Sequence, residues 1–231
     1  MRIEPEISDV YIVLAGSFNP AIFTPAWFVL HELLPAHVAD SSDTDVIHPD
    51  LAAFSTEWLS LHVTRERFTA RSLRDPHIRL CDLVLRLFNE HLPHTPLNAL
   101  GINRAVHFRL TSQVERDRVR RMLAPIEPWG NWGKEVGFDD HSGGMTSLTM
   151  AQFNPQGRPS GGAVNVTVEP SNVIAEGRSG IYVHVNDHYV ADGDEMAGRK
   201  HLMDFLDEGF EGSVKRSDDI IDHIMSLKGA G

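Results

Sequence analysis

Alternation of polar and apolar residues, which is typical of strands, recurs in neighbouring segments of this sequence. Residues 57–63 alternate between two faces, Arg65-Glu66 turns the chain, and residues 68–73 alternate again on the return. This pattern predicts an antiparallel hairpin. The same reasoning predicts strands or extended segments at residues 9–16, 46–54, 100–110, 145–153, 163–169 and 180–186.

Helical periodicity occurs between groups of these strands. The clearest case is residues 76–92, where apolar residues recur every three or four positions and Pro93 follows. Thr24-Pro25 and Asp75-Pro76 each combine an N-cap residue with proline at the first helical position. We predict helices at residues 25–35, 76–92, 114–123, 194–211 and 218–228, with loops at 38–45 and 129–144.

The order of these elements indicates the fold class. Because strands occur in runs, and not in strict alternation with helices, the order favours an α+β fold over a doubly wound α/β fold. We expect largely antiparallel sheet with helices packed on one face. The chain forms either one continuous domain or two similar small α+β halves, namely residues 1–125 and a C-terminal β-meander with two helices at residues 126–231.

The composition argues against several classes of protein. The chain has 231 residues, of which 42% are hydrophobic, so it can bury a core. Its single cysteine, Cys81, allows neither a disulfide within the chain nor a cysteine-based zinc site, which fits a reducing, cytoplasmic setting. We expect no membrane span and no signal peptide, because no apolar run is long enough. The net charge of −11 disfavours binding to nucleic acid.

The stretch VYIVLAGSFNP, residues 10–20, resembles the start of a nucleotidyltransferase of the adenylyl-transfer type. In that family a Thr or His stands two residues after the proline of the motif, and a His stands five residues after it. This chain has Ile22 and Pro25 at those places, and neither side chain can donate a hydrogen bond to a phosphate. The nucleotidyltransferase interpretation is therefore disfavoured, and a tight strand-to-helix turn is predicted instead.

Thirteen histidines raise the question of a metal site. His184 and His188 lie four residues apart, but their β-branched neighbours predict a strand, where such residues are ~13 Å apart and cannot share one zinc ion. We therefore predict no metal, no cofactor and no catalytic residue. His107 lies in a predicted strand with Arg104 and Arg109, and structural pairing is favoured over catalysis for these three residues.

Two tryptophans, Trp129 and Trp132, lie in the glycine-rich segment 129–144. Loops of this length in compact domains often carry function. Two interpretations stay open: the tryptophans form a binding surface, or they fold back onto the core.

Several longer stretches carry a resemblance when they are taken together. They are GSFNPAIFTPAW, HPDLAAFSTEWLSLHVTRERFTA, HTPLNALGIN, VEPS and VHVNDHY, followed by two helices and the step Phe210-Glu211-Gly212-Ser213. In this order they resemble a sporadically distributed family of uncharacterised bacterial α+β proteins, and the resemblance covers most of the chain. It implies no particular chemistry or binding residues, and it leans toward a defence or accessory role.

Two functions are consistent with these observations. The one we favour is a non-enzymatic interaction or accessory protein that self-associates as a C2 dimer and can also bind a protein partner, because the sequence does not blunt its edge strands. The other is a small-molecule-binding protein or an enzyme. Its cleft would be lined by Arg104, His107, Arg109, His184 and His188.

Overall fold

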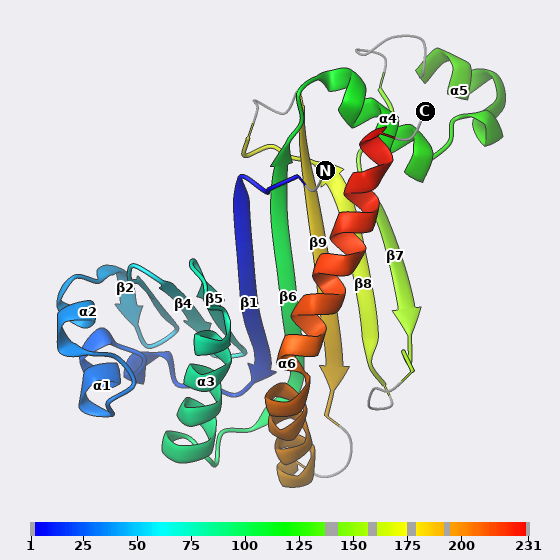
Figure 1. Ribbon diagram of the computed structural model, residues 1–231. Helices are drawn as coiled ribbons and strands as arrows, with labels where there is room; N and C mark the ends of the chain where they lie inside the picture. Colours follow the sequence, from blue (N-terminus) through cyan, green and yellow to red (C-terminus); the bar gives the residue numbers. More distant parts are fainter. Residues whose placement is uncertain (1–2, 137–142, 157–160, 175–178, 192–194, 230–231) are drawn as a thin grey trace.

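The centre of the protein is one nine-stranded sheet with the strand order β2-β3-β4-β5-β1-β6-β9-β8-β7 (Figure 1). The structure is a computed structural model that describes residues 3–136, 143–156, 161–174, 179–191 and 195–229. Every pair of neighbouring strands is antiparallel, which confirms the predicted α+β class. The strands are β1 (Ile7–Gly16), β2 (Asp43–His48), β3 (Leu51–Ser55), β4 (Leu59–Thr64), β5 (Arg67–Ser72), β6 (Leu97–Arg109), β7 (Leu148–Phe153), β8 (Ala163–Pro170) and β9 (Gly180–Val190).

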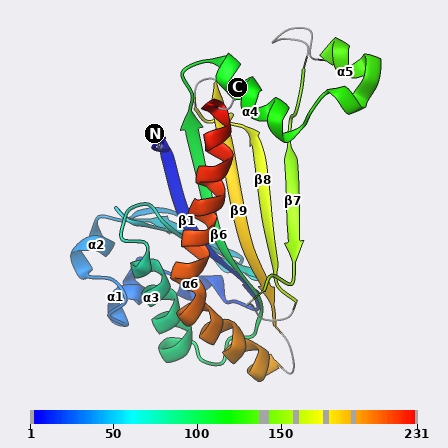
Figure 2. The same ribbon diagram turned by 45° about the vertical axis from the view of Figure 1, so that its right-hand side comes forward.

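The helices that pack on the sheet lie on one of its faces (Figures 1 and 2). We call this the helix-covered face and the opposite one the open face. The longest helix, α6, crosses the middle of the sheet over β6 and β9. The helical elements are η1 (Pro20–Ile22), α1 (Pro25–Leu30), α2 (Ala36–Asp40), α3 (Ile78–Arg86), the π-turn η2 (Leu87–His91), α4 (Gln113–Leu123), η3 (Glu127–Trp129), α5 (Gly130–Val136), α6 (Glu195–Ser226) and η5 (Leu227–Gly229).

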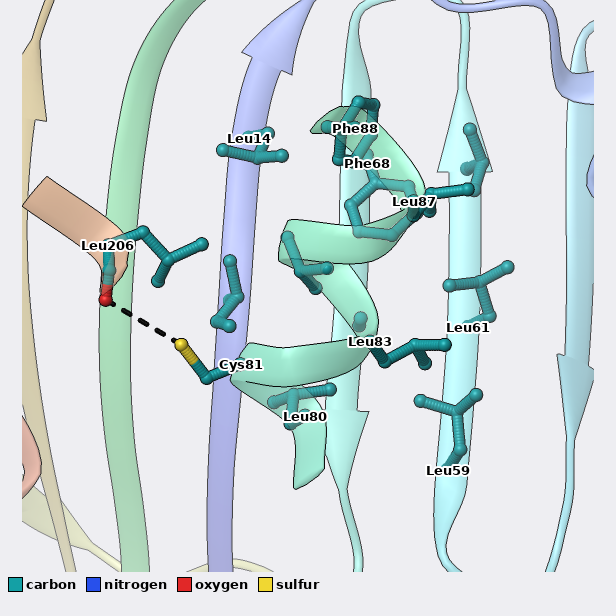
Figure 3. Close-up of a cluster of buried hydrophobic side chains, with 14 of the residues drawn as sticks. Leu14, Leu59, Leu61, Phe68, Leu80, Cys81, Leu83, Leu87, Phe88 and Leu206 are labelled. Atoms are coloured by element: carbon teal, nitrogen blue, oxygen red, sulfur yellow. Dashed lines mark hydrogen bonds between the residues drawn. The ribbon is translucent and has the colours of Figure 1, made fainter. Parts of the chain in front are cut away.

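Two apolar clusters hold these layers together. In the larger one, Leu80 and Phe88 pack with Leu14 and Phe68 of the strands beneath (Figure 3). The thiol of Cys81 points from α3 to the carbonyl oxygen of Leu206 in α6, at 3.6 Å. The smaller cluster joins α4 and the C-terminal part of α6 to β6, β8 and β9. The helices in these clusters therefore cover the face that the alternation in the strands leaves apolar.

One sheet spans both predicted halves of the chain. β6, from the first half, pairs along its length with β9, from the second, between the registers Ala99↔Val190 and Arg109↔Gly180. The residues around position 125 connect helices at the end of the sheet and do not separate two sheets.

The C-terminal region differs from the prediction of two helices, because α6 is continuous from Glu195 to Ser226. The second predicted helix, 218–228, would start at Ser217-Asp218, where serine is a common N-cap residue, but both side chains bond elsewhere. The Ser217 hydroxyl donates to the carbonyl oxygen of Ser213 one turn earlier (2.8 Å), and the Asp218 carboxylate accepts from Arg104 Nε (2.8 Å). Ser217 therefore bonds within the continuous helix and Asp218 bonds to the sheet, so neither side chain caps a new helix.

Several other predicted boundaries were wrong. The segment predicted at 46–54 is divided between β2 and β3. The helix predicted from Pro76 begins at Ile78, with His77 as its N-cap in place of Asp75. The loop predicted at 38–45 contains the end of α2 and the start of β2. The helix predicted at 25–35 ends at Leu30. The segment 129–144 is helical up to Val136, while residues 137–142 lie outside the described part of the chain. Among the described residues, no helix has both the length and the apolar character that crossing a bilayer requires.

Candidate interaction surfaces

The strand-to-helix turn after β1 is the first candidate, because it carries the nucleotidyltransferase-like residues. The backbone N–H groups of three successive residues are already bonded: Gly16 to Glu66 O (3.1 Å), Ser17 to Pro96 O (3.1 Å) and Phe18 to Arg65 O (2.8 Å). The Phe18 side chain is buried in the core. The amides that a glycine-containing turn offers to phosphate thus bind carbonyl oxygens of the chain itself, which fits the prediction of a tight turn.

The five residues predicted to line a common cleft lie in different places. Arg104 is on the helix-covered face, where its Nε donates to Asp218 and its guanidinium also donates to the carbonyl oxygen of Asp9 (3.2 Å). Arg109 lies at the end of β6 and forms two hydrogen bonds with the Glu6 carboxylate (2.6 and 2.8 Å). The structural pairing expected for these arginines is therefore present. The sheet itself separates Arg104 from His107 and His184, which are on the open face.

Four rings form a row on the open face, contributed by Tyr11, His107, Tyr182 and His184. His107 lies beside Tyr182 (ring centroids 4.6 Å apart), Tyr182 is nearly parallel to His184 (6.2 Å), and His184 is nearly parallel to Tyr11 (5.9 Å). Tyr11 comes from β1 and His184 from β9, so their rings meet across β6. We call these four residues the open-face row.

Hydrogen bonds tie the open-face row to the strands. Asn103 Oδ1 accepts from Asn186 Nδ2 (2.7 Å) and lies 3.0 Å from His184 Nε2, which is also 2.9 Å from the Tyr11 hydroxyl. Because a carbonyl oxygen only accepts, this arrangement favours a proton on His184 Nε2. His107 Nδ1 lies 2.8 Å from the Ser171 hydroxyl. Tyr11, His184 and His107 of the row therefore each have a hydrogen-bonding partner.

The open-face row is uncharged near neutral pH. Burial is the largest influence on both histidines, and it lowers the pKa of His184 and the pKa of His107. Burial, with a smaller contribution from the hydroxyl of Tyr182, raises the pKa of Tyr11 to about 12. A row of neutral, mutually bonded rings stabilises the three central strands as cross-strand pairs do.

His188 occupies the open face of β9, opposite Gly101 on β6 and Ala163 on β8. It lies in the same strand as His184, as predicted. Within the described residues, no group of three or more His, Cys, Asp or Glu side chains is placed to hold a metal ion.

The edge strand β7 is a different kind of surface. It pairs with β8 on one side, and among the described residues no strand pairs with its other side. Thr149 to Phe153 are exposed, and two of them are large and apolar: Met150 (67% exposed) and Phe153 (74%). No charged residue occurs between His141 and Arg158. This uncharged stretch is the sequence signal that marks β7, and the sequence-based prediction did not single it out.

The opposite edge strand, β2, is protected against pairing. It contains Asp43, Asp45 and His48 in six residues, and its register with β3 shifts between Thr44 and Val46. Charged side chains and bulges are the means by which natural sheets prevent edge-to-edge association. The expectation of unblunted edges therefore fits β7 and does not fit β2.

An apolar groove of about 510 Å³ runs between β7 and α6 on the helix-covered face. Its floor is formed by side chains of β7 and β8, including Met150, Val166 and Val168, and its wall by Ile220 and Ile224 of α6. The groove exists because α6 crosses over β6 and β9 and leaves the last two strands without a helix above them (Figure 2).

The tryptophan pair lies at the end of η3 and in α5. Trp129 and Trp132 are 61% and 59% exposed, and their rings meet edge to face with centroids 5.4 Å apart. Neither ring folds back onto the core, and the interpretation as a binding surface stays a prediction. Phe138, in the same segment, lies outside the described residues.

Comparison with models of known protein families finds no match for this chain, and comparison with curated proteins finds no matching relative. The resemblance to the sporadically distributed family accordingly stays a prediction, and the surfaces described above carry the functional argument.

Proposed function

We propose that this protein is a non-enzymatic interaction protein that self-associates as a C2 dimer, in which β7 of one copy pairs with β7 of the other. The observation that carries the proposal is the contrast between the two edges of the sheet. β7 is exposed, apolar and uncharged, whereas β2 carries charge and a bulge. An exposed, uncharged edge strand is a template for adding another strand.

Antiparallel pairing of β7 with its own copy determines the symmetry. The two-fold axis stands perpendicular to the sheet, so the sheet continues through both copies and both helix-covered faces lie on the same side. The two apolar grooves then adjoin, and the Met150 side chains lie near the axis. The assembly closes at two copies, because pairing of β7 with β2 would propagate without end and is opposed by Asp43 and Asp45.

Two further observations support a role in association over a role in catalysis. Four of the five residues predicted to line a cleft, namely Arg104, His107, Arg109 and His184, already bond to other side chains. The thiol of Cys81 is buried and directed to Leu206, so it is not exposed to a substrate or to a second copy of the chain. The association that we propose therefore involves no disulfide, as suits a reducing, cytoplasmic setting.

The test is the mass of the protein in solution, measured by sedimentation equilibrium or light scattering at tens of micromolar. We expect twice the chain mass of 25.8 kDa for the wild type. Met150→Lys places two like charges near the two-fold axis and is expected to give a monomer. The matched control is Ile47→Lys, at an exposed apolar residue of the other edge strand, which leaves the dimer intact. A monomeric wild type, or dissociation caused by Ile47→Lys alone, would overturn the proposal.

A further inference from the structure

The tryptophan pair is an exposed aromatic surface on the same side of the molecule as β7. In both views α5 lies outside the sheet, past β7 and beyond its N-terminal end (Figures 1 and 2). Tryptophan is among the residues most enriched at the energetic centres of interfaces. Trp129 and Trp132 are therefore a candidate contact surface.

The pair is held in a fixed arrangement. A Cβ atom at Gly133 would lie only 2.2 Å from the carbonyl oxygen of Ile126 and 3.0 Å from the Cβ of Trp129, so α5 packs closely on the turn that precedes it. This close approach fixes Trp132 relative to Trp129. The two rings are thus pre-organised, which reduces the entropy lost when a partner binds.

The geometry of the proposed dimer brings a matching surface to this place. In an antiparallel pair, the N-terminal end of one β7 lies beside the C-terminal end of the other. The C-terminal residue of β7 is Phe153, which is 74% exposed and alternates with Met150 and Gln152 onto the open face. The partner's β7 therefore runs toward α5 and ends there with an exposed aromatic side chain.

We propose that Trp129 and Trp132 of one copy pack against Phe153 of the other copy, so that each dimer contains two such aromatic clusters. This inference rests on the proposed function, because it needs β7 to pair with β7. The partner that we propose is a second copy of this chain. The exposed Phe153 lies at one end of β7, and the exposed tryptophan rings lie beyond the other end. Two-fold symmetry brings these two ends together. Clusters of this kind gain stability from edge-to-face ring contacts in addition to burial.

The experiment measures the dissociation constant of the dimer by sedimentation for Trp132→Ala, for Phe153→Ala and for the double variant. Each single change is expected to weaken the dimer about tenfold or more, because it removes a large aromatic side chain from both clusters of the dimer. The double variant should be weakened by less than the product of the two single effects, because both remove the same contact. Leu30→Ala, an equally exposed apolar residue on α1, is the matched control and should change nothing.

Tryptophan emission gives a second readout. Trp58 is buried and Trp27 is partly buried against the core, and neither belongs to the proposed contact. Dilution through the dissociation constant should therefore shift the emission to longer wavelength through Trp129 and Trp132, and this shift should be smaller in Trp132→Ala. If the wild type is a monomer, the proposed function fails and this inference fails with it. If the wild type dimerises and Met150→Lys dissociates it, while Trp132→Ala and Phe153→Ala keep the wild-type affinity, only the tryptophan contact is overturned.

Discussion

Gly16, where β1 ends, shows how close backbone packing restricts the side chain that a single position can carry. A Cβ atom at Gly16 would lie 2.2 Å from the carbonyl oxygen of Pro96, which is backbone and cannot move aside as a side chain can. The glycine of the nucleotidyltransferase-like motif therefore has a packing role in this chain. It allows the strand to end close to residues 65, 66 and 96, which accept the hydrogen bonds of the turn.

We predict that Gly16→Ala lowers the free energy of unfolding by about 1–3 kcal/mol, because the backbone must shift to make room. Gly212→Ala is the matched control, since a Cβ atom at Gly212 in α6 would meet nothing within 4 Å. Alanine there should raise the free energy of unfolding by about 0.5–1 kcal/mol. Urea unfolding at a fixed protein concentration measures both, and equal effects of the two changes would refute this account of Gly16.

His184 makes stability depend on pH. Burial lowers its pKa below the ordinary value of 6.5, so the unfolded chain takes up a proton at a higher pH than the folded chain does. The stability that this difference contributes is complete above pH 6.5 and is lost as the pH falls through the folded pKa. The slope for one such group is at most about 1.4 kcal/mol per pH unit.

We therefore predict that His184→Gln reduces the loss of unfolding free energy between pH 7.5 and pH 5.5, even though it removes a ring from the open-face row. Urea titrations at the two pH values give the difference directly. His62→Gln is a suitable control, because His62 is an exposed histidine on β4. An identical pH dependence in wild type and His184→Gln would show that His184 does not titrate differently on folding.

At the scale of elements, α6 is the clearest example of tertiary contacts overriding a local sequence signal. A buried carboxylate on β9, Asp187, accepts hydrogen bonds from Tyr189 (2.6 Å) and from Ser213 of α6, and Arg216 lies 3.6 Å away. The sequence predicted a helix ending at residue 211 and a second one starting at residue 218, and Ser213 and Ser217 lie between them. In the structure they sit on the buried side of one continuous helix.

Asp187→Ala is predicted to lower the free energy of unfolding by about 3–5 kcal/mol, because it leaves buried hydrogen-bonding groups and Arg216 without this carboxylate. Glu208→Ala, at an exposed position of the same helix, should change it by less than about 0.5 kcal/mol. Denaturant titrations of both variants test this. A change below 1 kcal/mol for Asp187→Ala would mean that α6 is held almost entirely by its apolar contacts.

Most individual elements were predictable from the sequence, and the failures have a common cause. The β4–β5 hairpin, the long strand β6 and helix α3 follow from alternation or helical periodicity over many residues. The short helices α2 and α5 have few residues in which a period can show. The continuity of α6 depends on partners in β6 and β9, which are distant in sequence, so a local reading could not find it.

At the scale of the whole molecule, the sequence predicted an antiparallel α+β protein but not the order of its strands. The candidate interaction surface, the edge strand β7, was not predicted either. Which strands lie at the edges depends on non-local pairing, so the contrast between β2 and β7 was not visible before the sheet was assembled. Four of the histidines and arginines singled out in the sequence bond to other side chains: His184 to Tyr11, Arg104 to Asp218, His107 to Ser171 and Arg109 to Glu6.

The central claim, that β7 pairs antiparallel with its own copy, can be tested most directly by cysteine scanning. A single cysteine is placed in turn at each of the six positions of β7, and one is placed at Ile47 of β2 as a control. Residues opposite each other in an antiparallel pair have Cα atoms about 4.5–5.5 Å apart, which suits a disulfide. We predict covalent dimers under mild oxidation for a cysteine at the centre of β7, with decreasing yield toward its ends and none from position 47. A dimeric protein that cross-links at no position of β7, or that cross-links as readily from position 47, would contradict this account.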